Sequence, residues 1–407
     1  MMCDTLVAVV DGRVLFAKSS DRDPNEAQAL DWRPAARHPD GATVRCTYLT
    51  IPQARETHAA LLSRPFWMWG AEIAANVHGV TVGNEAVFTR QPYAATGLTG
   101  MDLVRLAVER AATATDAVAI LGALLEQHGQ GGGCGHERRA FTYHNSFLVA
   151  DRTGAFVVET AGRRWLAERV ERAASISNAL TLPSLRGERD RLRTRVAEAD
   201  RRQACTLAAA RTARAPVDLF RALRDHGAGA TSPRYRWANG AMSGPCAHAG
   251  GLLASTQTVA SWVAELSPAG DRHWVTATAA PCLSLFKPVR LDEPLDLGPW
   301  PSDRADDRTL WWRHERMHRR AIGDRALAAA IATERDAIEA RWLAAPPSPR
   351  DAFAEADRAL ATWTARTAAA RDARPWFVRR YWRTRDRRAA LAPHDPVVPP
   401  AARVHSR

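Results

Sequence analysis

The sequence predicts a layered α+β protein with a helical C-terminal extension. The pattern over residues 1 to about 97 predicts short strands and turns, and a strand-like pattern returns after a pair of helical segments. Strands interleaved with paired helices are typical of sheets covered by helices. A proline-rich stretch over 281–301 marks a boundary, beyond which the pattern is nearly all helical. We expect one α+β domain over 1–300, a helical extension over 301–390 and a disordered tail over 391–407.

The first two strands are predicted to form a hairpin. Asp11-Gly12 lies between two β-rich runs, and Asp-Gly supplies the positive φ angles of a type I′ turn. In that register Cys3 lies opposite Ser20. Lys18 is then a diagonal neighbour on the same face, about 7–8 Å away, and Asp21 follows Ser20 directly. The register therefore predicts that Cys3, Lys18 and Asp21 come together.

The later elements follow from periodicity and capping signals. A helix is expected from Met101 to about Ala112, followed by a second helix with Thr115 as its N-cap, which ends at the glycine cluster 129–133. Strands are expected at 146–150, 156–159 and 175–177, helices over 185–226 and strands again within 250–286.

The composition argues against several classes of function. Lys and Arg number 56 against 44 Asp and Glu, a net charge of +12. The arginines alternate with acidic residues, as over 186–193, which is typical of solvated helix faces, so no nucleic-acid partner is expected. No apolar run reaches 18 residues and no signal peptide is recognisable, which predicts a soluble cytoplasmic protein without membrane contact. Six scattered cysteines indicate free thiols.

Cys3 is the strongest candidate for chemistry. It follows Met1-Met2, and if those residues are removed it carries both a thiol and a free α-amine. An amine with a pKa of about 7.7–8.0 can accept the proton of a thiol near 8.5, so one residue supplies nucleophile and base. Lys18 is one of only two lysines in the chain. Its compact ammonium differs chemically from a guanidinium, although an ordinary solvated lysine is the alternative.

Two asparagines and one histidine motif complete the candidates. Asn84 and Asn178 end apolar strands and can offer amide donors to an oxyanion, each worth about 2.7–4 kcal/mol, with turn or cap roles as the alternative. His314-Glu315-Arg316-Met317-His318 matches the His-Glu-x-x-His pattern of zinc peptidases. Neighbouring arginines oppose a divalent cation there, which favours a plain amphipathic helix. Cys282 is expected to be a buried strand cysteine.

Several segments resemble the secernin family, which is similar to the cysteine dipeptidases of the N-terminal nucleophile (Ntn) hydrolase superfamily. The resemblance implies a four-layer αββα Ntn-hydrolase sandwich. It implies that Cys3 is the nucleophile and that Asp21 orients its amine. Lys18 then stands where related amidases often carry arginine. Asn84 and Asn178 match the residues that stabilise the oxyanion or orient the substrate. Arg22, His144 and Asn145 are expected to contact substrate. The segments are Cys3-Asp-Thr, Lys18-Ser-Ser-Asp-Arg22, Gly83-Asn-Glu-Ala-Val87 and Tyr143-His-Asn-Ser-Phe147, with 63–72, 100–105, 159–162 and 309–316.

The predicted function is that of a cysteine amidohydrolase or dipeptidase, a C–N bond hydrolase that cleaves a dipeptide or small N-acyl amide through a Cys3 thioester. It requires that Met1-Met2 be absent, which a start codon at Met2 or autocatalytic removal of the leader would explain; the remaining alternative is an unprocessed and inactive protein. No cofactor and no metal are expected. The oligomeric state stays open, a homo-oligomer included. The alternatives are a non-catalytic, secernin-like regulatory or interaction protein and, third, a zinc peptidase using His314, Glu315 and His318.

Overall fold

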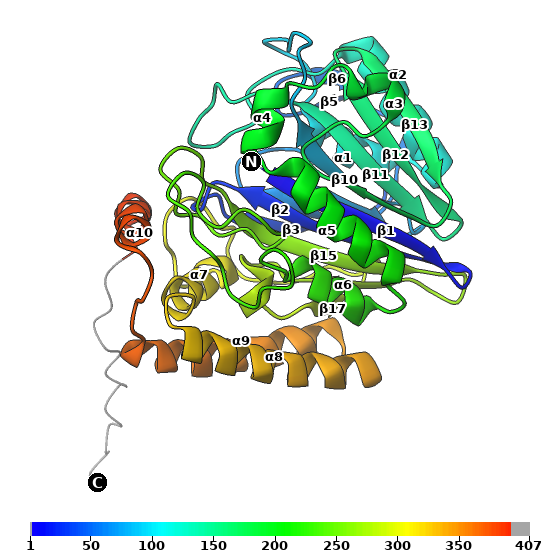
Figure 1. Cartoon of the computed structure of the whole chain (residues 1–407). Helices are drawn as coiled ribbons and strands as arrows, with labels where there is room; N and C mark the ends of the chain where they lie inside the picture. The colour runs from blue at the N-terminus through cyan, green and yellow to red at the C-terminus, as the bar shows by residue number, and fades with distance from the viewer. Residues whose placement is uncertain (1, 392–407) are drawn as a thin grey trace.

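A computed structural model of the chain describes residues 2–391 and contains two large antiparallel sheets with helices around them (Figure 1). The expected tail over 391–407 lies outside the described residues except for Leu391. The first sheet has the strand order β14 (Ala173–Ile176), β1 (Met2–Val10), β2 (Arg13–Arg22), β15 (Gln257–Leu266), β16 (Arg272–Val275) and β17 (Lys287–Val289).

The second sheet has seven strands, in the order β13 (Arg164–Val170), β12 (Gly154–Ala161), β11 (His144–Asp151), β10 (Thr81–Val87), β9 (Ile73–Asn76), β8 (Ala60–Pro65) and β3 (Gln28–Arg33). Two short ribbons accompany the sheets: β4 (Ala36–Arg37) pairs with β7 (Glu56–Thr57), and β5 (Thr43–Arg45) pairs with β6 (Thr50–Pro52).

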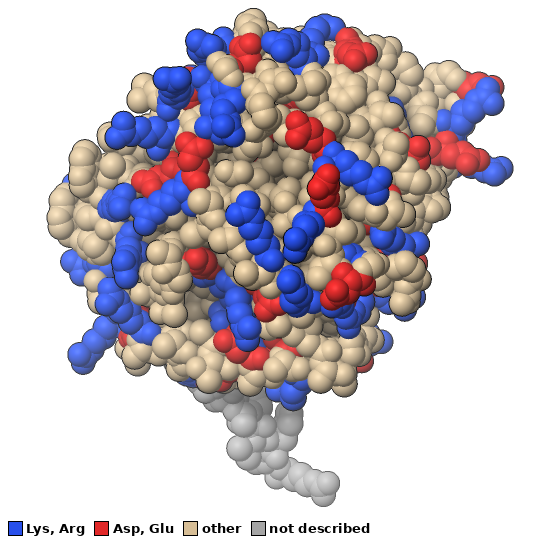
Figure 2. All heavy atoms as spheres, turned by 45° about the vertical axis from the view of Figure 1, so that its right-hand side comes forward, with Lys and Arg blue, Asp and Glu red and all other residues tan. Residues whose placement is uncertain are grey.

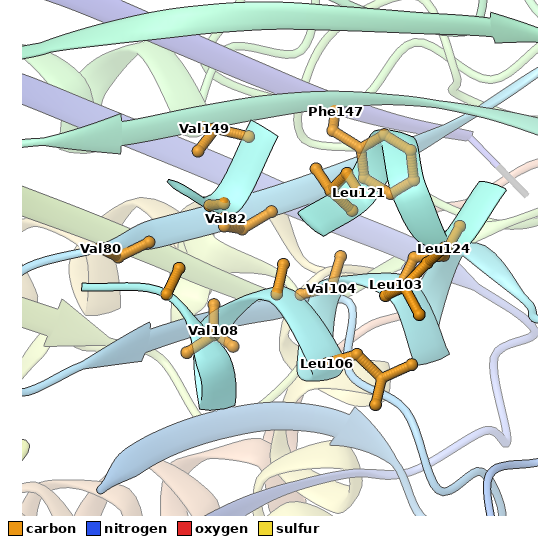
Figure 3. Close-up of a cluster of buried hydrophobic side chains, with 14 of the residues drawn as sticks. Val80, Val82, Leu103, Val104, Leu106, Val108, Leu121, Leu124, Phe147 and Val149 are labelled. Carbon is orange, nitrogen blue, oxygen red and sulfur yellow. The ribbon is translucent and has the colours of Figure 1, made fainter. Parts of the chain in front are cut away.

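The two sheets pack face to face, and each has helices on its outer face. Val7, Phe16, Leu148 and Trp262 belong to the apolar layer between the sheets. Helices α1 (Gly100–Arg110) and α2 (Ala114–His128) cover the second sheet, as Figure 3 shows for Val82, Val104, Leu121 and Phe147. Helices α5 (Ala199–Thr212) and α6 (Pro216–Leu223) cover the first sheet through a cluster that includes Leu6, Phe220 and Trp274. The αββα sandwich is confirmed.

The hairpin that carries Cys3 has the predicted register. Val10 pairs with Arg13 and Cys3 with Ser20. Asp11 and Gly12 adopt φ angles of 51° and 72°, as a type I′ turn requires. Since a two-residue turn fixes the pairing of every later residue, this short local signal determines which residues lie beside Cys3.

The cap of helix α2 and one edge strand differ from the prediction. Helix α2 is capped by Thr113 and not by Thr115: the Thr113 hydroxyl accepts the Asp116 N–H at 3.1 Å, and the Asp116 carboxylate accepts the Thr113 N–H at 3.1 Å. This capping box needs a spacing of three residues, which only Thr113 has. Strand β13 was not predicted, because its largely exposed face carries charged side chains such as Glu168.

The helices predicted over 185–226 and beyond 301 are present. The first group comprises α3 (Pro183–Arg186), α4 (Arg191–Val196), α5 and α6. Cys282 is buried as expected, but it lies in a short 3₁₀ helix, η1 (Pro281–Leu283), that leads into β17 and not in a strand. Helices of the C-terminal region pack around η1 through Leu283, Met317, Ile331 and Trp342. This region consists of α7 (Leu310–Ala321), α8 (Arg325–Ala344), α9 (Pro349–Arg366), η2 (Thr367–Ala369) and α10 (Trp376–Ala389).

The surface charge is dispersed on the face that Figure 2 shows, where Lys and Arg side chains alternate with acidic and uncharged ones. Many of the exposed arginines pair with a nearby carboxylate, as Arg308 does with Asp306 at 2.8 Å. Among the described residues no helix is both long and apolar enough to span a membrane.

Candidate active site

Cys3 is buried near the start of β1, and both its nitrogen and its sulfur are engaged. The backbone N–H donates to Asn178 Oδ1 at 3.2 Å. The sulfur accepts the backbone N–H of Asp21 at 3.3 Å and lies 3.7 Å from Glu72 Oε2. Burial raises the pKa of the Cys3 thiol above its usual range, although the Lys18 ammonium opposes this shift. With Met2 in place, the thiol is therefore protonated at neutral pH.

Lys18 lies on the same face of the hairpin as Cys3 and is fully buried. Its ammonium donates to the Asn84 carbonyl at 2.7 Å, the Ser19 carbonyl at 3.3 Å and the Glu85 carboxylate at 3.3 Å. Burial disfavours the charge, but the neighbouring thiol and carboxylates more than compensate and raise the pKa of Lys18. Lys18 is thus a fixed positive charge beside the thiol, not the solvated lysine of the alternative.

Glu85 is the anionic partner of Lys18 and was not among the residues predicted for the site. It also accepts the Thr5 hydroxyl at 2.5 Å. Burial raises the pKa of the Glu85 carboxyl to about 7, with Lys18 opposing the shift. Glu85 lies within the secernin-like segment Gly83-Asn-Glu-Ala-Val87, and this position is the one feature of the sequence that could have indicated a role in the site.

Asp21 pairs with Met2 across the hairpin, so the Asp21 side chain lies on the face opposite to that of Cys3. One carboxylate oxygen accepts the Thr258 hydroxyl at 2.6 Å. The other oxygen is buried and has no hydrogen-bond partner among the described residues. Burial raises the pKa of Asp21 to about 7. Its backbone contacts the Cys3 thiol, and its carboxylate retains an unused acceptor.

Asn178 positions Cys3 together with Arg202, an arginine that was not among the predicted site residues. The Asn178 amide donates to the Ala86 carbonyl at 2.7 Å, and its oxygen accepts both Cys3 N–H and the Arg202 guanidinium. Arg202, from α5, is fully buried, pairs with Asp4 at 2.6 Å and donates to the Cys3 carbonyl at 3.2 Å. No sequence signal distinguished Arg202 from the surrounding solvated arginines.

Arg22 was expected to contact substrate, but its guanidinium is used inside the protein. It pairs with Glu26 at 2.5 Å and with Glu72 at 2.9 Å, and donates to the Cys134 carbonyl at 2.8 Å. Glu72 in turn accepts the Ser20 hydroxyl at 3.3 Å. Arg22 therefore holds Glu72 beside the Cys3 thiol. Glu72 was missed as a site residue, although it ends the quoted segment 63–72.

Asn84, the predicted oxyanion donor, is not brought to the thiol. Strand side chains alternate between faces, and Glu85 faces the Lys18 side, so Asn84 faces the α1 layer. There its amide donates to Asn145 Oδ1 at 2.9 Å and to the Met101 sulfur at 3.5 Å. The motif located the strand correctly, but the Asn84 side chain lies on its other face.

Asn145 and His144, the other two expected substrate contacts, also have internal partners. The Asn145 amide donates to Gln130 at 2.9 Å. The His144 ring contacts the Thr89 hydroxyl at 3.0 Å and packs edge-on against Tyr93, and burial lowers the pKa of His144 to about 4. These contacts assign both residues to the support of β11.

Buried carboxyl groups outnumber buried cations around Cys3. Five carboxyls face three cations, all with side chains at most 2 % exposed. Because the pKa values of Asp21 and Glu85 are raised to about 7, these two carboxyls are partly protonated at neutral pH, and an additional cation at this place would favour their charged forms. The groups are Asp4, Asp21, Glu26, Glu72 and Glu85 against Lys18, Arg22 and Arg202.

A cavity of about 610 Å³ begins at Met2. Met2 is itself buried and lines the cavity, whereas Cys3, the next residue, is not part of the wall. The lining combines apolar side chains such as Phe88, Phe141 and Leu252 with arginines, among them Arg138 and Arg193, and with the carboxylates Asp23 and Glu137.

The His-Glu-x-x-His motif makes structural contacts. His314 donates to the Leu283 carbonyl at 3.1 Å, and Glu315 pairs with Arg319 at 2.6 Å and with His318 at 3.0 Å. Burial alone would raise the pKa of Glu315, but Arg319 and His318 outweigh it and lower the pKa to about 2. A carboxylate held this way is a poor general base, so the geometry does not support the zinc peptidase alternative.

The geometry thus collects a cysteine, a lysine and oriented amide and carboxylate groups at the start of an αββα sandwich. Residues 38–182 match Peptidase family C69. This match confirms the resemblance to the cysteine dipeptidases and the expectation of a C–N bond hydrolase, a cysteine peptidase or amidase in general. The matched segment contains Glu72, Asn84 and Asn178, while Cys3 and Lys18 precede it.

Solved structures to which this chain is similar share little sequence with it. Penicillin V acylase from Agrobacterium tumefaciens has 12% identity and a TM-score of 0.40, over 67% of this chain and 82% of the acylase. A mutant of conjugated bile acid hydrolase from Clostridium perfringens has 10% identity and a TM-score of 0.39, over 72% of this chain and 95% of the hydrolase. Similarities of this size carry no conclusion about the reaction.

Proposed function

We propose that this chain, once Cys3 is its first residue, is an Ntn-type cysteine amidohydrolase that cleaves a dipeptide or a small N-acyl amide. The observation that carries the proposal is the contact between the Cys3 nitrogen and Asn178 Oδ1 at 3.2 Å, beside the buried Cys3 thiol. A nitrogen held at that place can act, once it is a free amine, as the base that takes the proton of the Cys3 thiol.

The surroundings favour a free amine on Cys3. Such an amine has Asn178 Oδ1 as one acceptor, and the Asp21 oxygen without a partner among the described residues is the second that we assign to it. In its ammonium form it adds a positive charge to a site where buried carboxyl groups outnumber cations. Buried polar atoms without partners are uncommon, which favours this Asp21 oxygen as the acceptor of the additional hydrogen bond.

The reaction then proceeds through a thioester. The α-amine takes the thiol proton, the Cys3 sulfur attacks the substrate carbonyl carbon, and the Lys18 charge stabilises the thiolate. The tetrahedral intermediate collapses, the C–N bond breaks, and the leaving amine takes the proton from the Cys3 ammonium. Water activated by the same amine hydrolyses the thioester and returns the thiol. Asn178 acts as a positioning residue, since its amide is bonded to Ala86.

Removal of Met2 has a second consequence, because Met2 lines the cavity of about 610 Å³ and is bonded directly to Cys3, which does not line it. Its departure would connect the cavity with the thiol. The apolar part of the wall, including Phe88 and Leu252, suits an acyl chain or an apolar side chain, and Arg138 and Arg193 suit a carboxylate. This combination supports a dipeptide or N-acyl amino acid as substrate.

The test uses a fusion whose tag is cut directly before Cys3, with the new N-terminus verified by intact mass. Dipeptides and N-acyl amino acids are then assayed with this protein, with a chain that keeps Met2, and with Cys3→Ala, Cys3→Ser and Cys205→Ala. Cys205, half-buried on α5, is the matched control. We expect turnover only with an N-terminal Cys3 and unchanged turnover in Cys205→Ala. Undiminished activity in Cys3→Ala would refute the mechanism, and a correctly cut protein inert to substrates and thiol probes would favour the non-catalytic alternative.

A further inference from the structure

A second group of chemically reactive side chains lies outside the Cys3 site. His226, Cys246, His248 and Cys282 are all buried, and their ligand-type atoms lie within 4.8 Å of one another. His248 Nε2 lies close to each of the other three atoms. It lies 3.1 Å from His226 Nε2 and 3.4 Å from the sulfur of each cysteine.

Three separate segments bring these four residues together. His226 follows α6, Cys246 and His248 precede β15, and Cys282 belongs to η1. The Cys246 N–H donates to the Asp225 carbonyl at 3.0 Å. A Cβ on Gly244 would lie 2.3 Å from the Gly227 nitrogen, so the first two segments pack backbone against backbone. The arrangement is therefore built by the fold and is not a chance meeting of mobile side chains.

The spacing of the four atoms suits a tetrahedral ion. Zinc binds thiolate sulfur at about 2.3 Å and imidazole nitrogen at about 2.0–2.1 Å, which places tetrahedral ligands roughly 3.3–3.8 Å apart. The three separations made by His248 Nε2, 3.1 Å and twice 3.4 Å, come within a few tenths of an ångström of that range. All four atoms lie within 4.8 Å of one another, so side-chain shifts of at most about 1 Å bring every pair into the range. His226 Nδ1 lies 3.1 Å from the Ala230 carbonyl and donates to it, which leaves Nε2 free to bind metal.

We propose that His226, Cys246, His248 and Cys282 bind one zinc ion in a closed structural site. Two thiolates and two imidazoles are the donor set of structural zinc, and four protein ligands leave no position open for water. This site is distinct from the His314-Glu315-x-x-His318 motif, and it replaces the expectation of a metal-free chain and of Cys282 as a strand cysteine.

The ion would join three parts of the fold. The carbonyl of Cys282 accepts a hydrogen bond from Arg335 of α8, and the His318 ring of α7 lies 5.6 Å from the His248 ring. The segment with Cys246 and His248 also holds Thr258: the Ala247 N–H donates to the Thr258 hydroxyl at 2.9 Å. That hydroxyl donates to Asp21. The zinc site therefore supports both the C-terminal helices and the residue that orients Asp21.

The experiment measures metal in the purified full-length protein. After reconstitution with zinc and removal of excess ion, we expect about one zinc per chain by elemental analysis. Cobalt in its place should give the intense visible bands of a tetrahedral ion and the near-ultraviolet charge transfer of thiolate ligands. The double variant Cys246→Ser/Cys282→Ser should lose both. Cys46→Ser, at a buried cysteine on the other side of the sandwich, should keep both.

Two further measurements keep the proposal falsifiable if the double variant does not fold. X-ray absorption on the wild-type zinc protein should show two sulfur and two nitrogen neighbours, and metal removal should lower the melting temperature. A reduced protein that takes up no zinc, a cobalt spectrum without thiolate bands, or a native Cys246–Cys282 disulfide would overturn it. The zinc content and the ligand numbers should be the same in Cys3→Ala protein, so the test of the zinc site is independent of the proposed hydrolase activity.

Discussion

Lys18 lies directly against Gly83: a Cβ on residue 83 would be 2.5 Å from Lys18 Cδ and 3.3 Å from the Thr5 hydroxyl. The absence of a side chain on β10 therefore makes room for the buried lysine on β2. Position 83 is a glycine because its neighbour in the facing sheet occupies the space of a Cβ. The consequence is that Gly83 and Lys18 cannot be changed independently.

Gly83→Ala should displace Lys18 from Glu85. Overpacking of this kind costs about 1–3 kcal/mol of unfolding free energy, which urea denaturation measures. Under the proposed function, kcat/KM falls as well, since Lys18 stabilises the thiolate. Gly187→Ala is the matched control, because a Cβ there has nothing within 4 Å. Equal stability of both variants would contradict the close contact.

The pKa of Glu85 gives the stability a definite pH dependence. Its carboxyl shifts upward from 4.5 to about 7 on folding because of burial. Between these values the folded state binds more protons than the unfolded state, so this group's stabilising contribution is complete below about pH 4.5 and is lost as the pH rises to about 7. We expect the unfolding free energy of Glu85→Gln to fall less than that of wild type from pH 5 to 7.5. Parallel curves for the two proteins would show that Glu85 does not titrate in this range.

The sequence predicted what depends on local chemistry. The Asp11-Gly12 turn fixed the register of Cys3 against Ser20, and the resemblance supplied the sandwich. Arg202 and Glu72 reach Cys3 from distant segments, and no local pattern marks a contact of that kind. Asn84 shows that a motif is limited in the same way: the motif predicted the strand that carries Asn84 but not the face of the strand on which its side chain lies.

Arg202 is expected to be a major determinant of stability. Arg202→Met leaves Asp4 as a buried charge without its partner at 2.6 Å, and the loss of one member of such a pair costs about 3–5 kcal/mol. Asp4→Asn in the same chain should restore part of this loss. Arg201→Met, at the preceding and half-exposed position of α5, should change the unfolding free energy by less than about 0.5 kcal/mol. Equal unfolding free energies of the two arginine variants in urea would show that the pairing of Arg202 with Asp4 does not stabilise the fold to this extent.

The reactivity of Cys3 should depend on whether Met2 is present. In the chain that keeps Met2, the thiol is buried and its pKa is raised, so little reactive thiolate exists. Half-buried Cys205 should then be alkylated first. With Cys3 as first residue, the cavity opens onto the thiol and the amine can take its proton, which should accelerate Cys3 alkylation by about tenfold or more at neutral pH. Peptide mapping after timed iodoacetamide treatment follows both sites, with Cys205 as the internal reference whose rate stays constant. Equal Cys3 rates in the two chains would mean that Met2 does not shield the thiol.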